Sequence, residues 1–254
     1  MIPLTVLILT YNENENLGRT LNALRGVEHI ILVDSFSDDD TLDIARMHPQ
    51  VEIVQRQFDS FAGQCNFGLT KVRTEWVLSL DADYVLTPKL LAEILGLDPP
   101  CSVAGYRAGF RYCVLGRPLR ITLYPPRTVL YRRARAVYED QGHGHRVMID
   151  GSVQPLTGLI NHDDRKPLSR WLRSQDRYML IEAPHLLSAP ASALSRQDRL
   201  RRRAFLAPIV MFFYLMLARG LILDGWPGWY YVFQRTLAET LLALHIITER
   251  EKLH

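Results

Sequence analysis

Short apolar runs alternate with amphipathic segments through the first hundred residues. Runs rich in Leu, Ile and Val predict buried β-strands at 4–9, 30–33, 51–54 and 76–80. The segments between them place their apolar residues at helical spacing and predict helices at 16–24, 41–47, 61–72 and 88–97. Strands that alternate with such helices are typical of an α/β fold with a parallel sheet covered on both faces.

The remaining sequence changes character twice. Strands joined by irregular loops are expected at 103–114, 128–132, 146–150 and 155–160. The pattern then becomes helical, with helices expected at 167–187, at 197–223 with a break near Pro208, and at 229–251. The small residues and proline of 188–192 suit a linker. We therefore expect an α/β domain over residues 1–187 and a helical region over 188–254.

Two carboxylates follow the predicted strand 76–80 directly, as Asp81-Ala82-Asp83. Ligands of parallel α/β sheets bind at the carboxyl ends of the strands. A hard divalent cation is held there by one or two carboxylates together with substrate phosphates. The triplet alone also fits a loop with a helix cap, but its position at a strand end favours a site for Mg²⁺ or Mn²⁺ and a diphosphate.

Polar residues also follow the first two predicted strands. Thr10-Tyr11-Asn12-Glu13 ends the first, and Asp34, which ends the second, can accept hydrogen bonds from a base or ribose. The acidic residues 38–40 are better suited to capping the helix that begins at Thr41. The sequence contains neither the glycine-rich dinucleotide motif nor a P-loop, so those two nucleotide-binding classes lose their main support.

These elements resemble the family-2 glycosyltransferases, and most closely the subgroup similar to lipopolysaccharide core glucosyltransferases. The resemblance rests on the Thr-Tyr-Asn-Glu start, on Leu32-Val-Asp-Ser-Phe-Ser-Asp38, on Phe58–Leu69 and on Trp76–Asp83, in order and at family spacing. It implies a GT-A, Rossmann-like fold and a nucleotide-sugar donor, with UDP-sugar first among the donors. The departure is Ser35, because many relatives have a second acid after Asp34.

The resemblance also implies roles for individual residues. Two sets are implied, one at the nucleotide-sugar and one at the diphosphate and its metal. The first set is Thr10, Tyr11, Glu13, Asp34, Gln64, Asn66 and Asp81, and the second is Asp81 and Asp83.

The general base is expected in the segment Tyr138–His145. Inverting transfer needs a carboxylate that accepts the proton of the acceptor hydroxyl. Glu139-Asp140 resembles the Glu-Asp pair of the family, and Asp140 is favoured over Glu139. The histidines His143, His145 and His162 could also form a metal cluster with the acids after His162, or belong to surface and acceptor loops.

The C-terminal third joins a basic segment to an apolar one. Residues 195–203 contain five arginines and one aspartate, and residues 204–218 contain no charge. The apolar run is shorter than the roughly 20 residues that span a bilayer. The combination favours a helix lying on anionic lipid, with a membrane surface contact through residues 196–233. A buried helical subdomain or a dimer interface is the alternative, and the lack of aromatics among the arginines argues against nucleic acid.

Three unrelated cysteines form no metal or disulfide pattern, and residues 1–5 lack the features of a signal peptide. We therefore expect an enzyme on the cytoplasmic face of the inner membrane, peripheral or monotopic. The expected reaction is metal-dependent, inverting hexosyl transfer from a nucleotide donor to a cell-envelope glycan or lipid-linked saccharide. Transfer to a polyprenyl phosphate, and a non-catalytic membrane scaffold with a transferase-like domain, remain alternatives.

Overall fold

The computed structural model describes residues 2–121, 123–141 and 144–252, and the chain forms two compact units. Unit 1 consists of Met1–Pro118 and Thr122–Arg165, and unit 2 of Leu119–Ile121 and Lys166–His254. The boundary predicted between residues 187 and 188 falls inside unit 2, because the helix before it packs against the last helix of that unit.

The strands of unit 1 that lie in the described residues form a nine-stranded sheet in the order β3-β2-β1-β4-β8-β6-β11-β5, with β7 paired to β6. The first four strands in this order are parallel, and the rest of the sheet is mixed. Their bounds are β1 Leu4–Thr10, β2 Ile30–Asp34, β3 Val51–Gln55, β4 Trp76–Asp81, β5 Tyr84–Leu86, β6 Val103–Val114, β7 Arg117–Pro118, β8 Arg127–Arg132 and β11 Ser152–His162. The predicted α/β class is confirmed.

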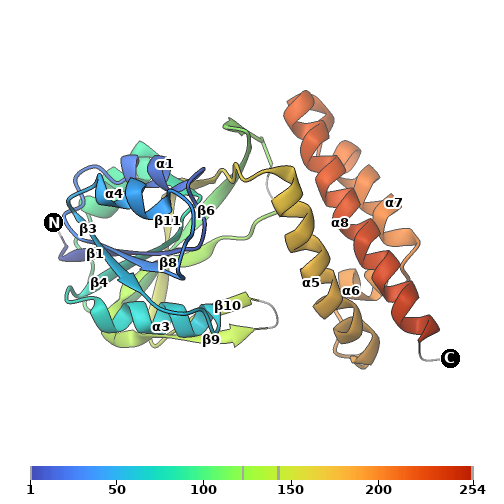
Figure 1. Cartoon of the computed structure of the whole chain (residues 1–254), viewed down its shortest axis with the longest axis horizontal. Helices are drawn as coiled ribbons and strands as arrows, with labels where there is room; N and C mark the ends of the chain where they lie inside the picture. Colours follow the sequence, from blue (N-terminus) through green and yellow to red (C-terminus); the bar gives the residue numbers. More distant parts are fainter. Residues whose placement is uncertain (1, 122, 142–143, 253–254) are drawn as a thin grey trace. The chain divides into compact units, whose positions relative to one another are not determined.

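Helices cover both faces of this sheet (Figure 1). The helices α1 (Leu17–Asn22), α2 (Thr41–Arg46) and α4 (Pro88–Leu95) lie over one face, and α3 (Phe61–Lys71) lies over the other. Side chains alternate between the two faces along β1. Leu4, Val6 and Ile8 pack with α1, α2 and α4, whereas Leu7 packs with α3. Strands β1 and β2 are therefore buried on both sides, whereas alternate residues of β11 are exposed.

A second, smaller β-structure lies beside α3. Strands β9 (Ala136–Gln141) and β10 (Gly144–Ile149) pair antiparallel, after a short 3₁₀ turn η1 (Arg133–Arg135). Tyr138 of β9 is buried in the same apolar cluster as α3. The sequence pattern predicted β10 but not β9, which carries the candidate base.

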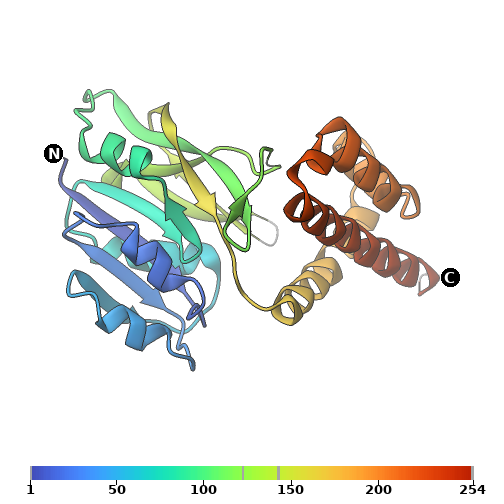
Figure 2. The same cartoon turned by 90° about the horizontal axis from the view of Figure 1, so that it is seen from above.

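Unit 2 is helical in its described residues (Figure 2). Its helices are α5 Leu168–Ser188, α6 Arg196–Arg201, α7 Leu206–Phe213, the π-helix η2 Tyr214–Ala218, the 3₁₀ helix η3 Leu221–Asp224 and α8 Trp226–Glu251. Helix α8 packs against both α5 and α7 around a small core of alanine, leucine and isoleucine side chains. No helix in the described part of the chain is long and apolar enough to cross a membrane.

The helix predicted over 197–223 with a break near Pro208 is interrupted earlier in the chain. The chain leaves the helix after Arg201, and Ala204 takes a left-handed backbone with φ of 56°. Pro208 does not break α7 as predicted, because it lies in the first turn, where a missing N–H costs no hydrogen bond.

Candidate functional site

The candidate site begins where three parallel strands end together. The register pairs Thr10 with Asp34 across β1 and β2, and Leu9 with Asp81 across β1 and β4. Parallel neighbours present their carboxyl ends at the same edge of a sheet. Three of the predicted donor-site residues, Thr10, Asp34 and Asp81, therefore meet at one edge.

Asp34 is fully buried and organises the loop after β2. Its carboxylate accepts hydrogen bonds from Thr10 Oγ1 at 3.3 Å, the Ser37 backbone N at 3.0 Å and Gln55 Nε2 at 3.0 Å. Phe36 in this loop has a φ of 62°, a conformation that is rare for a residue with a side chain. The Ser37 hydroxyl donates to the same carboxylate, so its acceptor positions are used within the chain, and Asp34 fixes the shape of the loop at the donor edge.

The loops after β1 and β2 are bound to each other. Asn12 has a φ of 56°, and its backbone N donates to Ser37 Oγ at 2.9 Å. Its side chain exchanges two hydrogen bonds with Asp38, at 2.6 and 2.9 Å. Tyr11 is 52% exposed at this point, so its ring is accessible as the predicted stacking surface.

The other polar residues of these loops serve the helix starts. The Glu13 carboxylate accepts from Asn16 Nδ2 at 2.9 Å, which secures the entry to α1. Of the three acids expected to cap α2, Asp39 accepts from the Thr41 backbone N at 2.9 Å. Asp40 occupies the N-cap position without a side-chain capping bond.

Asp83 is the buried carboxylate of the triplet, with 8% of its surface exposed. His162, at the end of β11, lies with Nε2 at 3.1 Å from Asp83 Oδ2. Burial lowers the pKa of His162, but the charge and hydrogen bond of Asp83 raise it, and the net pKa is above the usual value. The other ring nitrogen, Nδ1, is buried without a hydrogen-bond partner in the described residues.

An aromatic group surrounds this pair and was not identified from the sequence. The rings of Tyr84, Tyr112 and Tyr124 lie 5.0 to 5.3 Å from the His162 ring, centroid to centroid. Tyr84 and Tyr124 also share a hydrogen bond of 3.0 Å between their hydroxyls. Tyr84 follows Asp83 on the three-residue strand β5, which is too short to give a periodic signal.

A polar network behind the triplet fixes its backbone. The Asp83 carbonyl accepts from the Asp163 backbone N at 3.1 Å, and the Ala82 carbonyl accepts from Thr20 Oγ1 at 2.6 Å. Asp163 is itself buried and accepts from Arg19 NH1 at 2.6 Å. Because Thr20 and Arg19 belong to α1, that helix holds the triplet and the end of β11 together.

Asp140 and Glu139 are neighbours on β9, so their side chains point to opposite faces of the ribbon. Asp140 Oδ1 accepts from the Ala62 backbone N at 3.2 Å, in the first turn of α3. Burial raises the pKa of the Cys65 thiol, and the charges of Asp81 and Asp140 raise it further. Asp140 therefore lies at the start of α3, while Glu139 points to the other face of the ribbon.

The pKa of His145 is also affected by charges in this part of unit 1. Burial lowers its pKa, the charges of Asp81 and Asp140 act to raise it, and that of Arg127 acts to lower it. The ring is stacked on Phe61 at 5.5 Å. The Arg127 guanidinium lies over the Tyr124 ring at 4.6 Å, and that ring lies beside His162, so Arg127 is a cation of this site that the sequence motifs did not indicate.

Gln64 and Asn66, both on α3, contact the chain itself. Gln64 Nε2 donates to Ser35 Oγ at 3.1 Å and to the Arg56 carbonyl at 3.0 Å, while its Oε1 is buried without a partner in the described part. Asn66 uses both ends of its amide on the backbone of Tyr138, at 2.9 Å each. Asn66 therefore positions β9, and with it the candidate base.

The carboxylates fit a metal that is shared with a ligand. Within the described residues, no group of three His, Cys, Asp or Glu side chains could hold a metal ion. The predicted histidine cluster is therefore not found there, and His143 lies outside the described residues. Mg²⁺ commonly uses one or two carboxylates and completes its shell with phosphates and water. Asp81 and Asp83 match that requirement.

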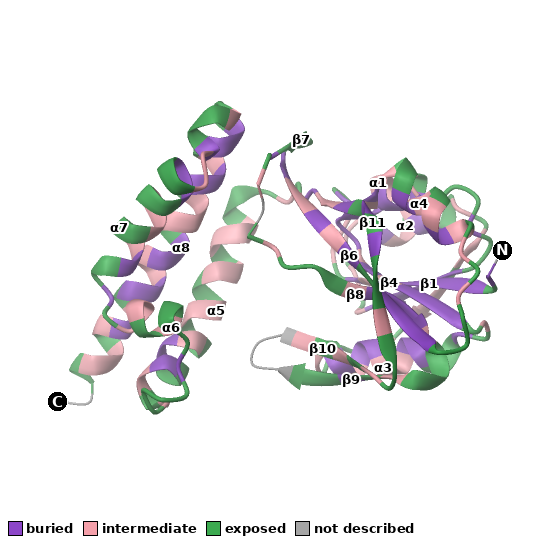
Figure 3. Cartoon of the chain, turned by 180° about the vertical axis from the view of Figure 1, so that it is seen from behind, coloured by how far each residue is buried: buried purple, intermediate pink, exposed green. Residues whose placement is uncertain are grey.

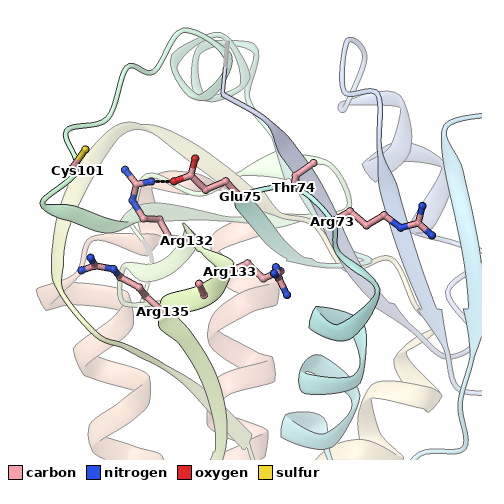
Figure 4. A pocket seen from close by; sticks show the side chains of 8 residues that line it. Arg73, Thr74, Glu75, Cys101, Arg132, Arg133 and Arg135 are labelled. Carbon is pink, nitrogen blue, oxygen red and sulfur yellow. Dashed lines mark hydrogen bonds and ion pairs between the residues drawn. The ribbon is translucent and has the colours of Figure 1, made fainter.

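A separate hollow lies away from this edge (Figure 4). Its volume is about 490 Å³, and it is found where the chain enters β4 and leaves β8. Arg132 is ion-paired with Glu75, and the guanidinium of Arg73 points away from those of Arg132 and Arg135. The arginines do not converge on one point, so the hollow does not form a common anion site. The lining residues are Arg73, Thr74, Glu75, Cys101, Arg132, Arg133, Ala134 and Arg135.

The sequence of unit 1 matches a family model. The model described as glycosyl transferase family 2 matches residues 5–134, which cover β1 to β8 and most of the candidate donor edge. The chain therefore belongs to the family-2 glycosyltransferases, and the sheet and its helices have the GT-A arrangement. The predicted resemblance is confirmed.

Individual relatives are similar over different lengths. The lipopolysaccharide core biosynthesis glycosyltransferase LpsC of Rhizobium meliloti (strain 1021) is 24% identical over 243 residues, 89% of this chain and 85% of LpsC. An uncharacterized glycosyltransferase, RP128, of Rickettsia prowazekii is 30% identical over 95 residues, 37% of this chain and 32% of that protein. Among solved structures, Staphylococcus aureus TarS 1–349 aligns with a TM-score of 0.43 and 15% identity, over 99% of this chain and 92% of that one.

Proposed function

We propose that the chain transfers a sugar, with inversion, from a UDP-sugar to a hydroxyl of a cell-envelope glycan or lipid-linked saccharide. The observation that carries the proposal is the Asp81 and Asp83 pair at the carboxyl edge of the parallel strands, and the candidate base Asp140 lies at the start of α3. The similarity to LpsC along 89% of the chain supports an acceptor of the lipopolysaccharide core class.

Asp81 and Asp83 would hold a divalent cation together with the donor diphosphate. When bound, the cation would neutralise the charge that develops on the leaving diphosphate. The burial of Asp83 and the fixed backbone of the triplet keep these carboxylates oriented before the donor arrives. Tyr11 offers its exposed ring to the base at the other end of the same edge.

Asp140 would act as the general base. The acceptor oxygen forms a bond to the anomeric carbon while the bond from that carbon to the diphosphate oxygen breaks. The hydroxyl proton passes to Asp140, and the electron pair of the broken bond leaves with the diphosphate. Asn66 holds the β9 backbone two residues before this carboxylate, so it is a positioning residue.

The substitution Asp83→Asn tests the proposal, because it keeps the size of the side chain and removes its charge. We expect transfer from a UDP-sugar to fall by about 100-fold or more, since metal-assisted charge stabilisation contributes several kcal/mol. Asp98→Asn, in the exposed loop after α4, is the matched control and should leave transfer unchanged. Full activity of the folded Asp83→Asn protein would refute the assignment of Asp83 to the diphosphate.

The nature of the acceptor is tested by Glu139→Gln combined with Asp140→Asn. A hydroxyl acceptor needs a base, so transfer should fall by about 100-fold or more. A phosphate acceptor is already an anion. Full transfer to polyprenyl phosphate by the double variant would therefore replace the proposed glycan acceptor with a lipid phosphate. A wild-type chain that binds nucleotides but transfers no sugar would favour the alternative of a non-catalytic membrane scaffold.

A further inference from the structure

Unit 2 exposes a continuous group of large apolar side chains. All of them are at least 38% exposed, and they lie on α7, η2, η3 and the first half of α8. We name this group the apolar face. Its members are Phe205, Leu206, Ile209, Val210, Phe213, Tyr214, Leu217, Ile222, Leu223, Trp226, Trp229, Phe233 and Leu237.

The first part of the apolar face follows a helical repeat. Its members between residues 205 and 217 come in pairs four residues apart, which places them on one side of α7 and η2. The opposite side is also apolar, since Ala207, Leu215 and Met216 are buried. In Figure 3, α7 is mostly green and pink. A helix that is apolar all round, yet exposed on one side, needs a second apolar partner.

The second part of the apolar face is a stripe on α8. Trp226, Trp229, Phe233 and Leu237 are spaced by three and four residues, and the opposite side of α8 faces the core of unit 2. The ring of Phe212 on α7 lies 6.4 Å from Trp229 and 6.4 Å from Phe233. These contacts join the two parts into one surface, and exposed apolar patches of this extent mark interaction sites.

The charged residues beside the apolar face indicate what kind of partner fits it. The run 204–218 contains no charged residue, and α6 lies directly before it. Two of the five arginines between 196 and 203 are used inside unit 2, since Arg201 pairs with Glu239 at 2.6 Å and Arg202 donates to the Ala189 carbonyl at 3.1 Å. The three others are exposed, namely Arg196, Arg199 and Arg203. Cations beside an apolar surface match an anionic lipid leaflet.

We propose that the apolar face inserts into the headgroup region of an anionic lipid leaflet, with the three exposed arginines on lipid phosphates. Two exposed tryptophans and Tyr214 in the face suit this interface, where amphipathic rings concentrate. A second copy of the chain fits less well. The apolar face of a second copy has no acidic side chain among its members for the exposed arginines, whereas an anionic leaflet supplies phosphates. The contact is independent of the proposed catalytic function.

Vesicle flotation of the full chain tests the proposal. We expect binding to vesicles that contain phosphatidylglycerol, and weaker binding to pure phosphatidylcholine. Ile209→Glu with Phe213→Glu, at positions 57% and 55% exposed, should weaken binding on the order of 100-fold, because two apolar contacts are lost. The matched control is Leu180→Glu with Ile181→Glu on α5, at positions that are each 54% exposed, and it should bind as the wild type does.

The arginines are tested separately. Arg196→Gln, Arg199→Gln and Arg203→Gln should each weaken binding to anionic vesicles by about fivefold and leave binding to phosphatidylcholine unchanged. Equal loss of binding in the α5 control would overturn the proposal. So would a wild-type chain that ignores vesicles but forms a dimer that Ile209→Glu with Phe213→Glu dissociates in sedimentation. Sugar transfer is not measured in any arm, so failure here would leave the catalytic proposal untouched.

Discussion

Units 1 and 2 use their apolar side chains in opposite ways. In unit 1 the largest of them, Trp76 and Tyr131, are almost completely buried, and the sheet is covered on both faces. In unit 2 the core cluster consists mainly of alanine, leucine and isoleucine, while two of the three tryptophans and most phenylalanines remain exposed. Burial of large apolar surface is the main source of stability. Unit 1 therefore buries most of its large apolar side chains, whereas unit 2 leaves much of its apolar surface exposed.

The buried acidic residues of the two units also have different partners. In unit 1, Asp34 and Asp83 are buried at the candidate donor edge, where their partners shape loops. In unit 2, Glu239 is 3% exposed and pairs with Arg201, which ties α6 to α8 away from the apolar face. The first kind of buried charge shapes loops at the candidate donor edge, and the second holds helices together.

The largest expected effect comes from breaking the buried pair of unit 2. Glu239→Gln removes the nearer of the two carboxylates that pair with the largely buried Arg201 guanidinium and leaves only Asp198 at 3.7 Å, so we expect unit 2 to lose about 3 kcal/mol of stability. Calorimetry should show a lower midpoint for the helical unit, while nucleotide binding by unit 1 at 25 °C is retained.

The control for Glu239→Gln lies on the same helix. Glu249 pairs with Lys252 at 2.6 Å, with 30% and 64% of the two side chains exposed. Glu249→Gln should change stability by less than about 1 kcal/mol, because exposed pairs contribute little. If Glu239→Gln and Glu249→Gln had the same small effect, the pair with Arg201 would not be what holds α6 to α8.

The sequence pattern predicted unit 1 better than unit 2 for a physical reason. Strands buried on both faces must be continuous apolar runs, so the predicted strand 76–80 and the observed β4 differ by one residue. The polar residue that ends each run then marks the site, as Asp34 and Asp81 do. β9 was missed because it is a half-exposed ribbon strand with two adjacent acids, Glu139 and Asp140, which resembles a loop in a single sequence.

Contacts between segments that are distant in the sequence could not be predicted from local patterns. His162 lies on Asp83 only because β11 pairs with β5 at the far edge of the sheet, and no local pattern encodes that pairing. In unit 2, Pro208 indicated a break, but the chain turns at Ala204. Helical spacing identified the apolar run, whereas its exposure depends on how α7 packs against α8.

The smallest expected effect concerns a carboxylate that stabilises the fold of unit 1. The register of β11 shifts between Pro155 and Leu159, and Glu93 of α4 accepts from the Thr157 and Gly158 backbone N–H groups at 2.9 and 2.8 Å. Burial acts to raise the pKa of Glu93, but these hydrogen bonds lower it, and the net pKa is below its usual value. Glu93→Gln should cost about 1–2 kcal/mol at neutral pH.

The effect of Glu93→Gln should depend on pH with a definite sign. A carboxyl group whose pKa is lowered by folding stabilises the protein above its unfolded pKa of about 4.3, and this contribution is lost as the pH falls through the folded pKa. The difference in unfolding free energy between wild type and Glu93→Gln should therefore be greatest near pH 7 and shrink below about pH 4. Glu52→Gln, exposed on β3, should change stability by less than about 0.5 kcal/mol at either pH. A difference for Glu93→Gln that grows as the pH falls would mean that the β11 backbone does not stabilise the ionised carboxylate.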